Sequence, residues 1–246
     1  MEWRDEGIVL SRRALGERDA LLVLFTPDHG RHLGIVKGGA GRRRGPLLQP
    51  GNRLEATWRA RLERHLGQFD LEAIRLYPAG FLDRPRELAA LASALVLLDV
   101  TLPERDPHPR LYAALLALLE HLAASAPDWP AAYVEFELLL LAELGFGLDL
   151  ASCAVTGEGR DLAYVSPKTG RAVSRGAAGE WASRLLPLPA FLIGEAPAEV
   201  PAGEIAQGLR LAGHFLNRHI FEPADRLMPA PRVRFAGLWH PEEEDG

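Results

Sequence analysis

Residues 19–39 read DALLVLFTPDHGRHLGIVKGG, in which two short runs rich in Val, Leu, Ile and Phe flank the turn sequence TPDHG. Short apolar runs bounded by Pro, Gly and Asp are typical of β-strands that pair as a hairpin. Runs of the same kind occupy GIVLSRRALG (7–16), RLEATWRARLE (53–63) and FDLEAIRLYP (69–78). Since no helix-length pattern interrupts them, we expect a five-stranded, closed or nearly closed OB-fold barrel over residues 1–80.

From residue 84 onward the apolar residues recur at the helical spacing of 3.6. We expect a first helix near Arg84, a second that Asp106 caps and Pro107 opens, a third over 128–145 and a last over 204–221. The third is apolar almost all round, which favours the middle of a bundle. The expected core-facing residues are Leu88, Leu91, Leu95, Leu98 and Leu102 in the first helix, Leu111, Leu115, Leu118 and Leu122 in the second, and Ile205, Leu209, Ala212, Leu216 and Ile220 in the last.

The fold class predicted from these patterns is α+β. The barrel over residues 1–80 is followed by an α-helical bundle domain over 81–150 and 180–246, into which a small turn-rich loop module over 151–179 is inserted. A short helix is expected near 180–186. The tail HPEEEDG (240–246) is expected to be disordered.

The charge is unevenly distributed along the 246 residues. Residues 1–80 hold 14 Lys and Arg against 10 Asp and Glu, a balance of +4, whereas the other 166 hold 14 against 23, a balance of −9, which gives the net charge of −5. An acidic protein with one basic lobe suits contact with an anionic polymer at that lobe and with a protein partner elsewhere.

The most basic stretch is KGGAGRRRGP (37–46), the expected connection between strands three and four. It lacks the Lys-Ser or Lys-Thr of a Walker loop, and Arg44 stands where a dinucleotide fingerprint needs its third glycine. Mobile guanidinium groups can instead make bidentate contacts with a phosphodiester chain; the alternative is a solvated basic loop. The candidate DNA-binding residues are Lys37, Arg42, Arg43, Arg44, Arg31, Arg53 and Arg59. Trp58, Phe69 and His32 are candidates for base stacking, although Trp58 and Phe69 fit core positions of strands better.

Catalytic and metal motifs are not found in the sequence. There is no G-x-S-x-G, no H-E-x-x-H and no carboxylate pair beside a base, so no enzyme activity and no cofactor are expected. His29 and His32 are close in sequence but have no third ligand nearby. Arg210, His214 and Arg218 recur at steps of four on the last helix, as a solvated face or as a docking surface for an acidic peptide or DNA.

Three stretches together resemble the RecO family of bacterial DNA repair and recombination mediators. They are EGIVLSRRALGERDALLVLFTPDHGRHLGIVKGGAGRRR (6–44), FELLLLAELGFGLDLASCAVTG (136–157) and DLAYVSPKTGRAV (161–173). The resemblance implies an N-terminal OB-fold, a helical domain, and binding of single- and double-stranded DNA with annealing of complementary strands. It also implies binding of the C-terminal tail of single-stranded DNA-binding protein (SSB), and a joint action with RecR in the loading of RecA. For these partners the candidate residues are Arg110 beside Leu111, or Arg210 with Arg218.

The chain departs from the family at the four-cysteine zinc module that many members carry. The corresponding positions read Cys153, Thr156, Ser174 and Ala177, and one thiolate cannot hold a structural zinc. We therefore expect no metal, and a module held by packing and hydrogen bonds. Cys153 is expected to be a buried small residue.

Two hypotheses of different classes follow. The first is a non-enzymatic DNA-binding mediator whose basic lobe neutralises phosphates so that complementary strands can pair. The second is a protein-interaction adaptor whose barrel is a docking module, which the acidic total charge favours. An RNA-binding barrel also stays open, because a sequence-tolerant groove rarely reads the 2′-hydroxyl. The single cysteine, the polar start MEWRDEG and apolar runs too short to span a bilayer predict a soluble cytoplasmic protein, here nucleoid-associated.

Overall fold

The computed structural model describes residues 1–42, 44–62, 64–81, 83–194 and 199–239. Contacts between Cα atoms divide the chain into two compact units, Met1–Ala124 and Ser125–Gly246. The first unit holds a barrel and two helices, and the second holds the remaining helices and a small sheet.

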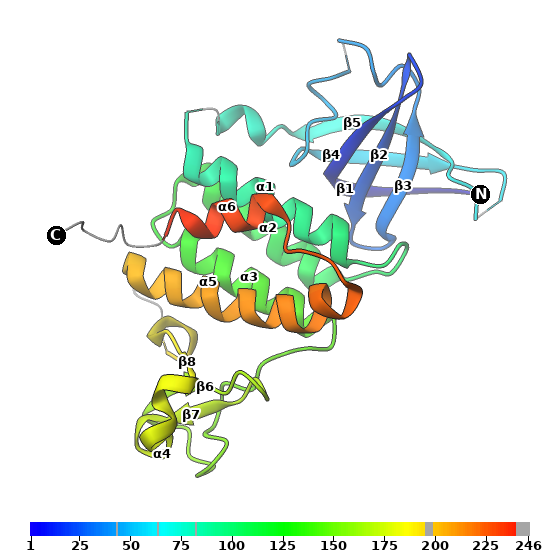
Figure 1. Cartoon of the computed structure of the whole chain (residues 1–246). Helices are drawn as coiled ribbons and strands as arrows, with labels where there is room; N and C mark the ends of the chain where they lie inside the picture. The colour runs from blue at the N-terminus through cyan, green and yellow to red at the C-terminus, as the bar shows by residue number, and fades with distance from the viewer. Residues whose placement is uncertain (43, 63, 82, 195–198, 240–246) are drawn as a thin grey trace. The chain divides into compact units, whose positions relative to one another are not determined.

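The five predicted strands form a closed barrel with the order β1-β2-β3-β5-β4 (Figure 1). All neighbouring pairs are antiparallel except β3 and β5, which pair in parallel at Ile35 and Gln68 and close the barrel. The strand bounds are β1 (Glu2–Leu15), β2 (Asp19–Thr26), β3 (Gly30–Val36), β4 (Arg53–Arg59) and β5 (Gln68–Arg75). The predicted α+β fold with an N-terminal OB-type barrel is confirmed.

The continuous apolar run of β2 reflects burial on both of its faces. Leu22 and Leu24 belong to the barrel core, while Val23 and Phe25 alternate with them and are also buried. Phe25 meets Tyr112 of α2 (Pro109–Ala124) edge to face, with ring centroids 5.6 Å apart. Because successive side chains point to opposite faces of a strand, this one strand joins the barrel core to the helical layer of the same unit.

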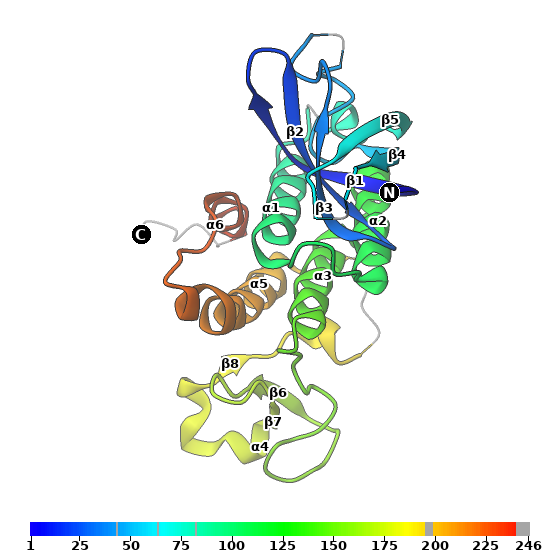
Figure 2. The ribbon, with the colours of Figure 1, turned by 90° about the vertical axis from the view of Figure 1, so that its right-hand side faces the viewer.

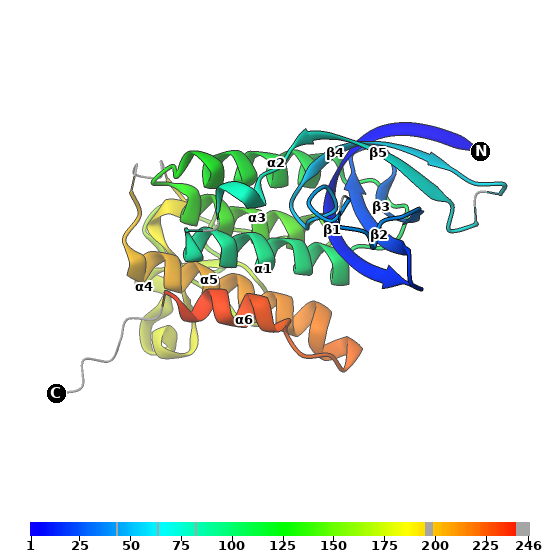
Figure 3. The same cartoon turned by 90° about the horizontal axis from the view of Figure 1, so that it is seen from above.

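Two helices complete the first unit, α1 (Pro85–Thr101) and α2 (Pro109–Ala124), and Figure 3 shows both extending away from the barrel. The predicted start of the second helix at Pro107 is wrong, since the helix begins at Pro109 and residues 104–106 form a bridge and a turn against β3. Glu104 bridges to Arg31, and the Arg105 amide donates to the Arg31 carbonyl (2.9 Å). Gly30 allows this approach, because its φ is +63° and a Cβ there would lie 2.1 Å from the Asp106 carbonyl oxygen.

One predicted core position of α1 is also wrong. Leu88 is 38 % exposed, whereas Leu91, Leu95 and Leu98 are buried as expected. Ala90, Ala94 and Leu97 are buried as well, so the buried stripe is centred on the later turns of the helix, away from Leu88. A short 3-10 turn (Pro78–Gly80) precedes this helix.

The second unit is built on α3 (Trp129–Glu143), α5 (Ala202–Leu216) and α6 (Ala230–Gly237). The last predicted helix does not run regularly to Phe221, because α5 gives way to a π-helical turn over Asn217–Phe221. A π turn inserts one residue, so the buried position moves from the predicted Ile220, which is half-buried, to Phe221, which is 1 % exposed. A 3-10 turn (Glu222–Ala224) follows, and the helix α6 was not predicted from the sequence.

The turn-rich segment folds as a small sheet with the order β7-β6-β8, gathered with α4 in one small lobe of the second unit (Figure 2). Its elements are β6 (Leu162–Val165), β7 (Ala172–Ser174), α4 (Arg175–Ala178) and β8 (Leu186–Pro187), with 3-10 turns at Gly179–Arg184 and Ala190–Leu192. The short helix predicted over 180–186 is a 3-10 helix over Gly179–Arg184, and its predicted end is wrong, since Leu186 lies in a strand. Cys153 is fully buried, and the Ser174 amide donates to its Sγ (3.3 Å). The predicted tail over 240–246 lies outside the described residues.

Candidate nucleic-acid interface

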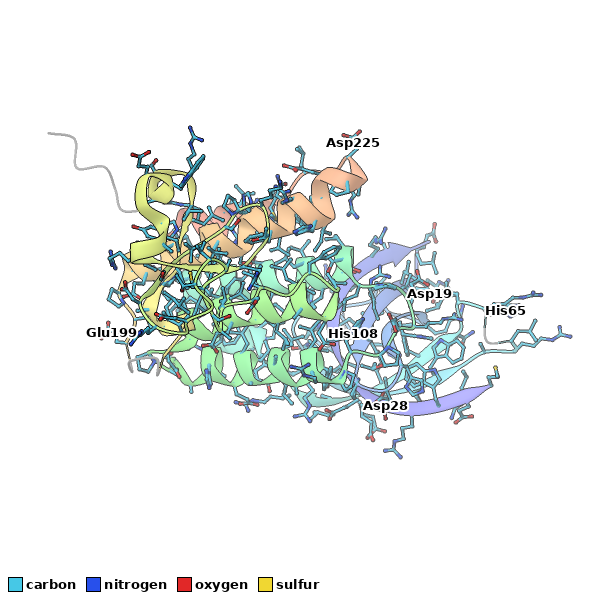
Figure 4. The ribbon with its side chains drawn as sticks, turned by 90° about the horizontal axis from the view of Figure 1, so that it is seen from below. Asp19, Asp28, His65, His108, Glu199 and Asp225 are labelled. Carbon is cyan, nitrogen blue, oxygen red and sulfur yellow. The ribbon has the colours of Figure 1, made fainter. Side chains whose placement is uncertain are left out.

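A groove of about 930 Å³ lies on the barrel where β3, β4 and β5 come together. Its polar walls are formed by the end of β3, the β3–β4 connection, the end of β4 and the β4–β5 loop. The residues that line it include three predicted DNA-binding residues, Lys37, Arg44 and Arg59, together with Arg61, His65, Gln68 and Phe69. Figure 4 shows His65 on the loop that projects from the barrel.

The shape of the groove follows from the way the barrel closes. The Ile35 amide donates to the Gly67 carbonyl (3.0 Å) beside the single parallel pair, which fixes the β4–β5 loop against β3. Gly67 has a φ of +66°, and a Cβ there would lie 2.3 Å from Trp58 Nε1. The Trp58 indole in turn donates to the Leu66 carbonyl (3.0 Å). The loop therefore wraps over a buried tryptophan and holds its cationic residues above it.

The groove carries an excess of positive charge. Lys37, Arg44, Arg59 and Arg61 give +4 and Glu2 and Asp70 give −2, a balance of +2 with His65 counted as neutral. The Lys37 ammonium pairs with Asp19 (2.8 Å) and holds the pKa of that carboxyl below its usual range through their hydrogen bond. Arg59 donates to Glu2 (3.0 Å) and lowers the pKa of Glu2 in the same way.

These two ion pairs are exposed, with the Lys37 and Arg59 side chains 62 % and 60 % accessible. An exposed pair of this kind contributes little to stability, because solvent and salt screen it. A phosphate oxygen can therefore replace the carboxylate as the partner of either cation at little loss.

The loop over residues 37–46 holds Arg42 and Arg44, two of the predicted DNA-binding residues. Arg42 and Arg44 are exposed, and neither side chain has a hydrogen bond or ion pair within the described part of the chain. Arg43 lies outside the described residues. The loop itself is anchored at both ends, since the Ala40 amide donates to Arg18 and the Asn52 amide group donates to the Pro46 and Leu47 carbonyls (2.8 Å each). The described ends of the loop are thus held in place, and they carry the Arg42 and Arg44 guanidinium groups without a partner among the described residues.

Arg31 and Arg53 are placed differently from the other predicted residues. The Arg31 side chain is 13 % exposed and donates to Asp99 of α1 (3.0 Å from Nε). The Arg53 side chain is 24 % exposed and pairs with Glu6, and neither arginine lines the groove. Burial lowers the pKa of Arg53, and the hydrogen bond with Glu6 reverses this and raises it overall. Both guanidinium groups hold the unit together.

The candidate partner-binding residues are divided between the units. Arg110 is exposed at the start of α2, whereas Arg210 on α5 and Arg218 in the π turn are exposed in the second unit. Between Arg210 and Arg218, the His214 ring is hydrogen-bonded to the Pro167 carbonyl (3.0 Å), and after Arg218 the His219 ring stacks on Phe146 (4.7 Å between centroids). The predicted stripe is therefore interrupted by a histidine that ties α5 to the β6–β7 turn.

Sequence reasoning missed the cations of two loops. Arg61 and His65 line the groove from the β4–β5 loop, and Arg12 reaches from β1 to the Gly45 carbonyl (3.4 Å). The signal was present, because RLERHLG (61–67) is the β4–β5 loop and SRRALGER (11–18) covers the end of β1 and the turn to β2, and OB-folds contact oligonucleotides with these two connections.

The described residues contain neither a metal-binding cluster nor a helix that could cross a membrane. No three His, Cys, Asp or Glu side chains among them come together in a way that could hold a metal ion. Within the same ranges, no helix combines the length and the apolar character that crossing a membrane requires.

Comparison with known proteins identifies the family of the chain. The family model for the recombination protein O N terminal matches residues 1–77, and the model for the recombination protein O C terminal matches residues 83–227. A protein named DNA repair protein RecO from Cereibacter sphaeroides is 52 % identical over 238 residues, which cover 97 % of this chain and 98 % of that protein. The proteins of the same name from Rhodospirillum rubrum (51 %, 96 % and 95 % covered) and Methylobacterium nodulans (49 %, 97 % and 98 % covered) are also similar. The chain therefore belongs to the RecO family.

Proposed function

We propose that this protein is a non-enzymatic recombination mediator in DNA repair that binds DNA along the cationic groove of the barrel. The observation that carries the proposal is that Lys37 and Arg44 of the loop over 37–46 meet Arg59 of β4 on one groove of about 930 Å³. Membership of the RecO family and the similarity to DNA repair proteins support it.

The mechanism follows from charge neutralisation. Two complementary strands repel one another through their phosphates, and each cation that contacts a phosphate displaces a condensed counterion. The groove and the neighbouring Arg42 lower that repulsion for both strands, so that bases can pair without ATP hydrolysis. Since the groove offers backbone contacts, annealing is expected to be tolerant of sequence.

In this proposal the three segments of the chain have different roles. Residues 1–80 bind DNA, the helical domain over 81–150 and 180–246 contacts the SSB tail and RecR, and residues 151–179 form the zinc-module-like insertion without zinc. With these partners the protein assists RecA loading at the nucleoid. Arg110, and Arg210 with Arg218, are the proposed partner-binding residues.

A strand-annealing assay without ATP tests the proposal. The wild-type protein should accelerate duplex formation from two complementary oligonucleotides, and the Arg42→Ala/Arg44→Ala variant should lose most of that acceleration. Arg4→Ala is the matched control, because Arg4 is an exposed barrel arginine that pairs with Glu55 (2.7 Å) outside the groove. A wild-type protein that neither binds nor anneals DNA alone contradicts the proposal and favours the adaptor function.

Partner contacts are tested separately. Titration of a labelled SSB tail peptide into Arg110→Ala and into Arg210→Ala/Arg218→Ala chooses between the two proposed surfaces. Unchanged affinity in both variants would remove all three arginines from the partner site.

A further inference from the structure

A second hollow of about 340 Å³ opens on the barrel beside the groove. Its lining includes Trp3, Asp28, His29, His32, Trp58 and Arg105. Met1 and Glu2 line both hollows, so the start of β1 is the wall that separates them. We call the second hollow the aromatic pocket, and its volume lies within the range of about 300–1,000 Å³ that is usual for small-ligand sites.

Flat rings dominate the aromatic pocket. His29 stacks on Trp3 with centroids 4.1 Å apart and an interplanar angle of 10°, and Trp3 lies parallel to Trp58 at 5.8 Å and 16°. The stack ends at His29, whose side chain is 32 % exposed and whose Nδ1 is held by Asp5 at 2.9 Å. A planar ligand can extend such a stack without any strain in the rings.

His32 forms a polar part of the pocket wall. It is 3 % exposed, and within the described residues neither of its ring nitrogens has a hydrogen-bond partner. Burial, with the nearby Arg105 and His29 charges, lowers the pKa of His32 to about 4, so the ring is neutral at pH 7. A neutral imidazole offers one donor and one acceptor, and it is unfavourable to bury either of them without a partner.

The rim of the pocket carries one cation and one anion. The Arg105 guanidinium donates to the His65 carbonyl (3.1 Å) and lies 5.9 Å from the Trp58 ring centroid. Arg105 has a φ of +61°, a conformation that a non-glycine residue adopts at a cost and that is enriched at functional sites. Asp28 brings an exposed carboxylate to the same pocket (Figure 4). This balance of charge disfavours a phosphate and favours a neutral ring with donors and acceptors on its edge.

We propose that the aromatic pocket binds one unpaired nucleobase of a single strand whose phosphates lie in the adjacent cationic groove. The base extends the ring stack at His29 and presents its edge to His32, Asp28 and Arg105. The strand crosses from one hollow to the other over Met1 and Glu2. The inference rests on the proposed function and deepens it, because it adds base contact to backbone contact at the same face of the barrel.

The test compares two oligonucleotides of equal length and equal phosphate number, one with bases and one made of abasic residues, by fluorescence anisotropy with the full chain. Stacking of one base predicts that the wild-type protein binds the base-containing strand about tenfold more tightly. His29→Ala should remove this preference and leave both the abasic affinity and the salt dependence unchanged. His29→Phe, which keeps a flat ring, should restore it, and Trp181→Ala, an exposed tryptophan of the second unit, is the control.

Equal wild-type affinity for the two strands overturns the proposal and leaves the proposed function intact, and so does an equal loss on both strands in His29→Ala. If the wild-type protein binds neither strand, both the proposed function and the proposal of a strand-bound base in the pocket are refuted. In that case a guanosine titration followed by tryptophan quenching, with Trp3→Leu as control, decides whether the pocket takes a free nucleoside instead.

Discussion

Arg31 of β3 donates from Nε to Asp99 of α1 at 3.0 Å, and the two side chains are 13 % and 16 % exposed. The pair joins residues 68 positions apart and fixes the barrel to the helical layer of the first unit. A guanidinium that appears in the sequence as part of a basic patch is therefore a structural link.

Replacement of Arg31 should separate stability from DNA binding. Arg31→Ala leaves Asp99 half-buried without its partner, so we expect the free energy of unfolding to fall by about 1–3 kcal/mol in urea titration. The salt dependence of DNA affinity should stay as in the wild type. A loss of salt dependence with unchanged stability would instead return Arg31 to the DNA-binding site.

The buried pair of the second unit gives a larger effect. Arg232 of α6 donates to both carboxylate oxygens of Glu137 of α3 (2.8 Å each), and Tyr133 donates to the same carboxylate (2.9 Å). Glu137 is fully buried and Arg232 is 4 % exposed. Arg232→Met should lower the free energy of unfolding by about 3–5 kcal/mol, because it leaves an unpaired buried charge.

The double variant Glu137→Met/Arg232→Met should recover part of this loss, since no charge then stays buried. Arg160→Met is the control, because Arg160 pairs with Glu158 at the surface with its side chain 82 % exposed. A single variant no less stable than the control would show that the pair does not hold α6 in place.

Two glycines with the same backbone angle make a matched test of the β4–β5 loop. Gly67 and Gly38 both have a φ of +66°. A Cβ at Gly67 would lie 2.3 Å from Trp58 Nε1, whereas a Cβ at Gly38 would have no atom within 4 Å among the described residues. Gly38→Ala should lower the free energy of unfolding by about 1–2 kcal/mol from the backbone alone. Gly67→Ala should lower the free energy of unfolding by about a further 1–3 kcal/mol, because its Cβ clashes with the Trp58 ring. Equal losses in chemical unfolding would mean that the loop moves freely over the tryptophan.

Stability should depend on pH through His32. Its pKa is about 4 in the folded protein and 6.5 when unfolded, so between these values the unfolded chain binds more protons. Above pH 6.5 the His32 ring is neutral in both states and does not change the free energy of unfolding. As the pH falls below 6.5, the unfolded chain gains the proton first, so the free energy of unfolding decreases, by about 3 kcal/mol at pH 4 relative to its value above pH 6.5. His32→Leu should reduce the loss of stability between pH 6.5 and 4, and an identical pH profile in the variant would contradict the assignment.

The sequence was sufficient to predict the barrel and the positions of its charged loops. Alternating apolar runs and turn residues are local signals, and the connections between strands determine which loops meet at the open face of an OB-fold. Hence Lys37, Arg44 and Arg59 could be selected in advance.

Features that depend on distant partners could not be selected in this way. Whether Arg31 or Arg59 is available for a ligand depends on the burial of Asp99 and the exposure of Glu2, which no local pattern encodes. Likewise the shift from Ile220 to Phe221 arises from a π turn, and α6 is short and is anchored by the buried Arg232. These elements are stabilised by tertiary contacts more than by their own propensity.

The dependence of single-stranded DNA affinity on salt concentration tests the cationic groove most directly. Each phosphate contact on a single strand contributes about 0.7 to the slope of log affinity against log salt concentration. The triple variant Lys37→Ala/Arg44→Ala/Arg59→Ala should therefore flatten the slope by about two, while Arg4→Ala leaves it unchanged. A triple variant with the wild-type slope would show that DNA does not lie in this groove.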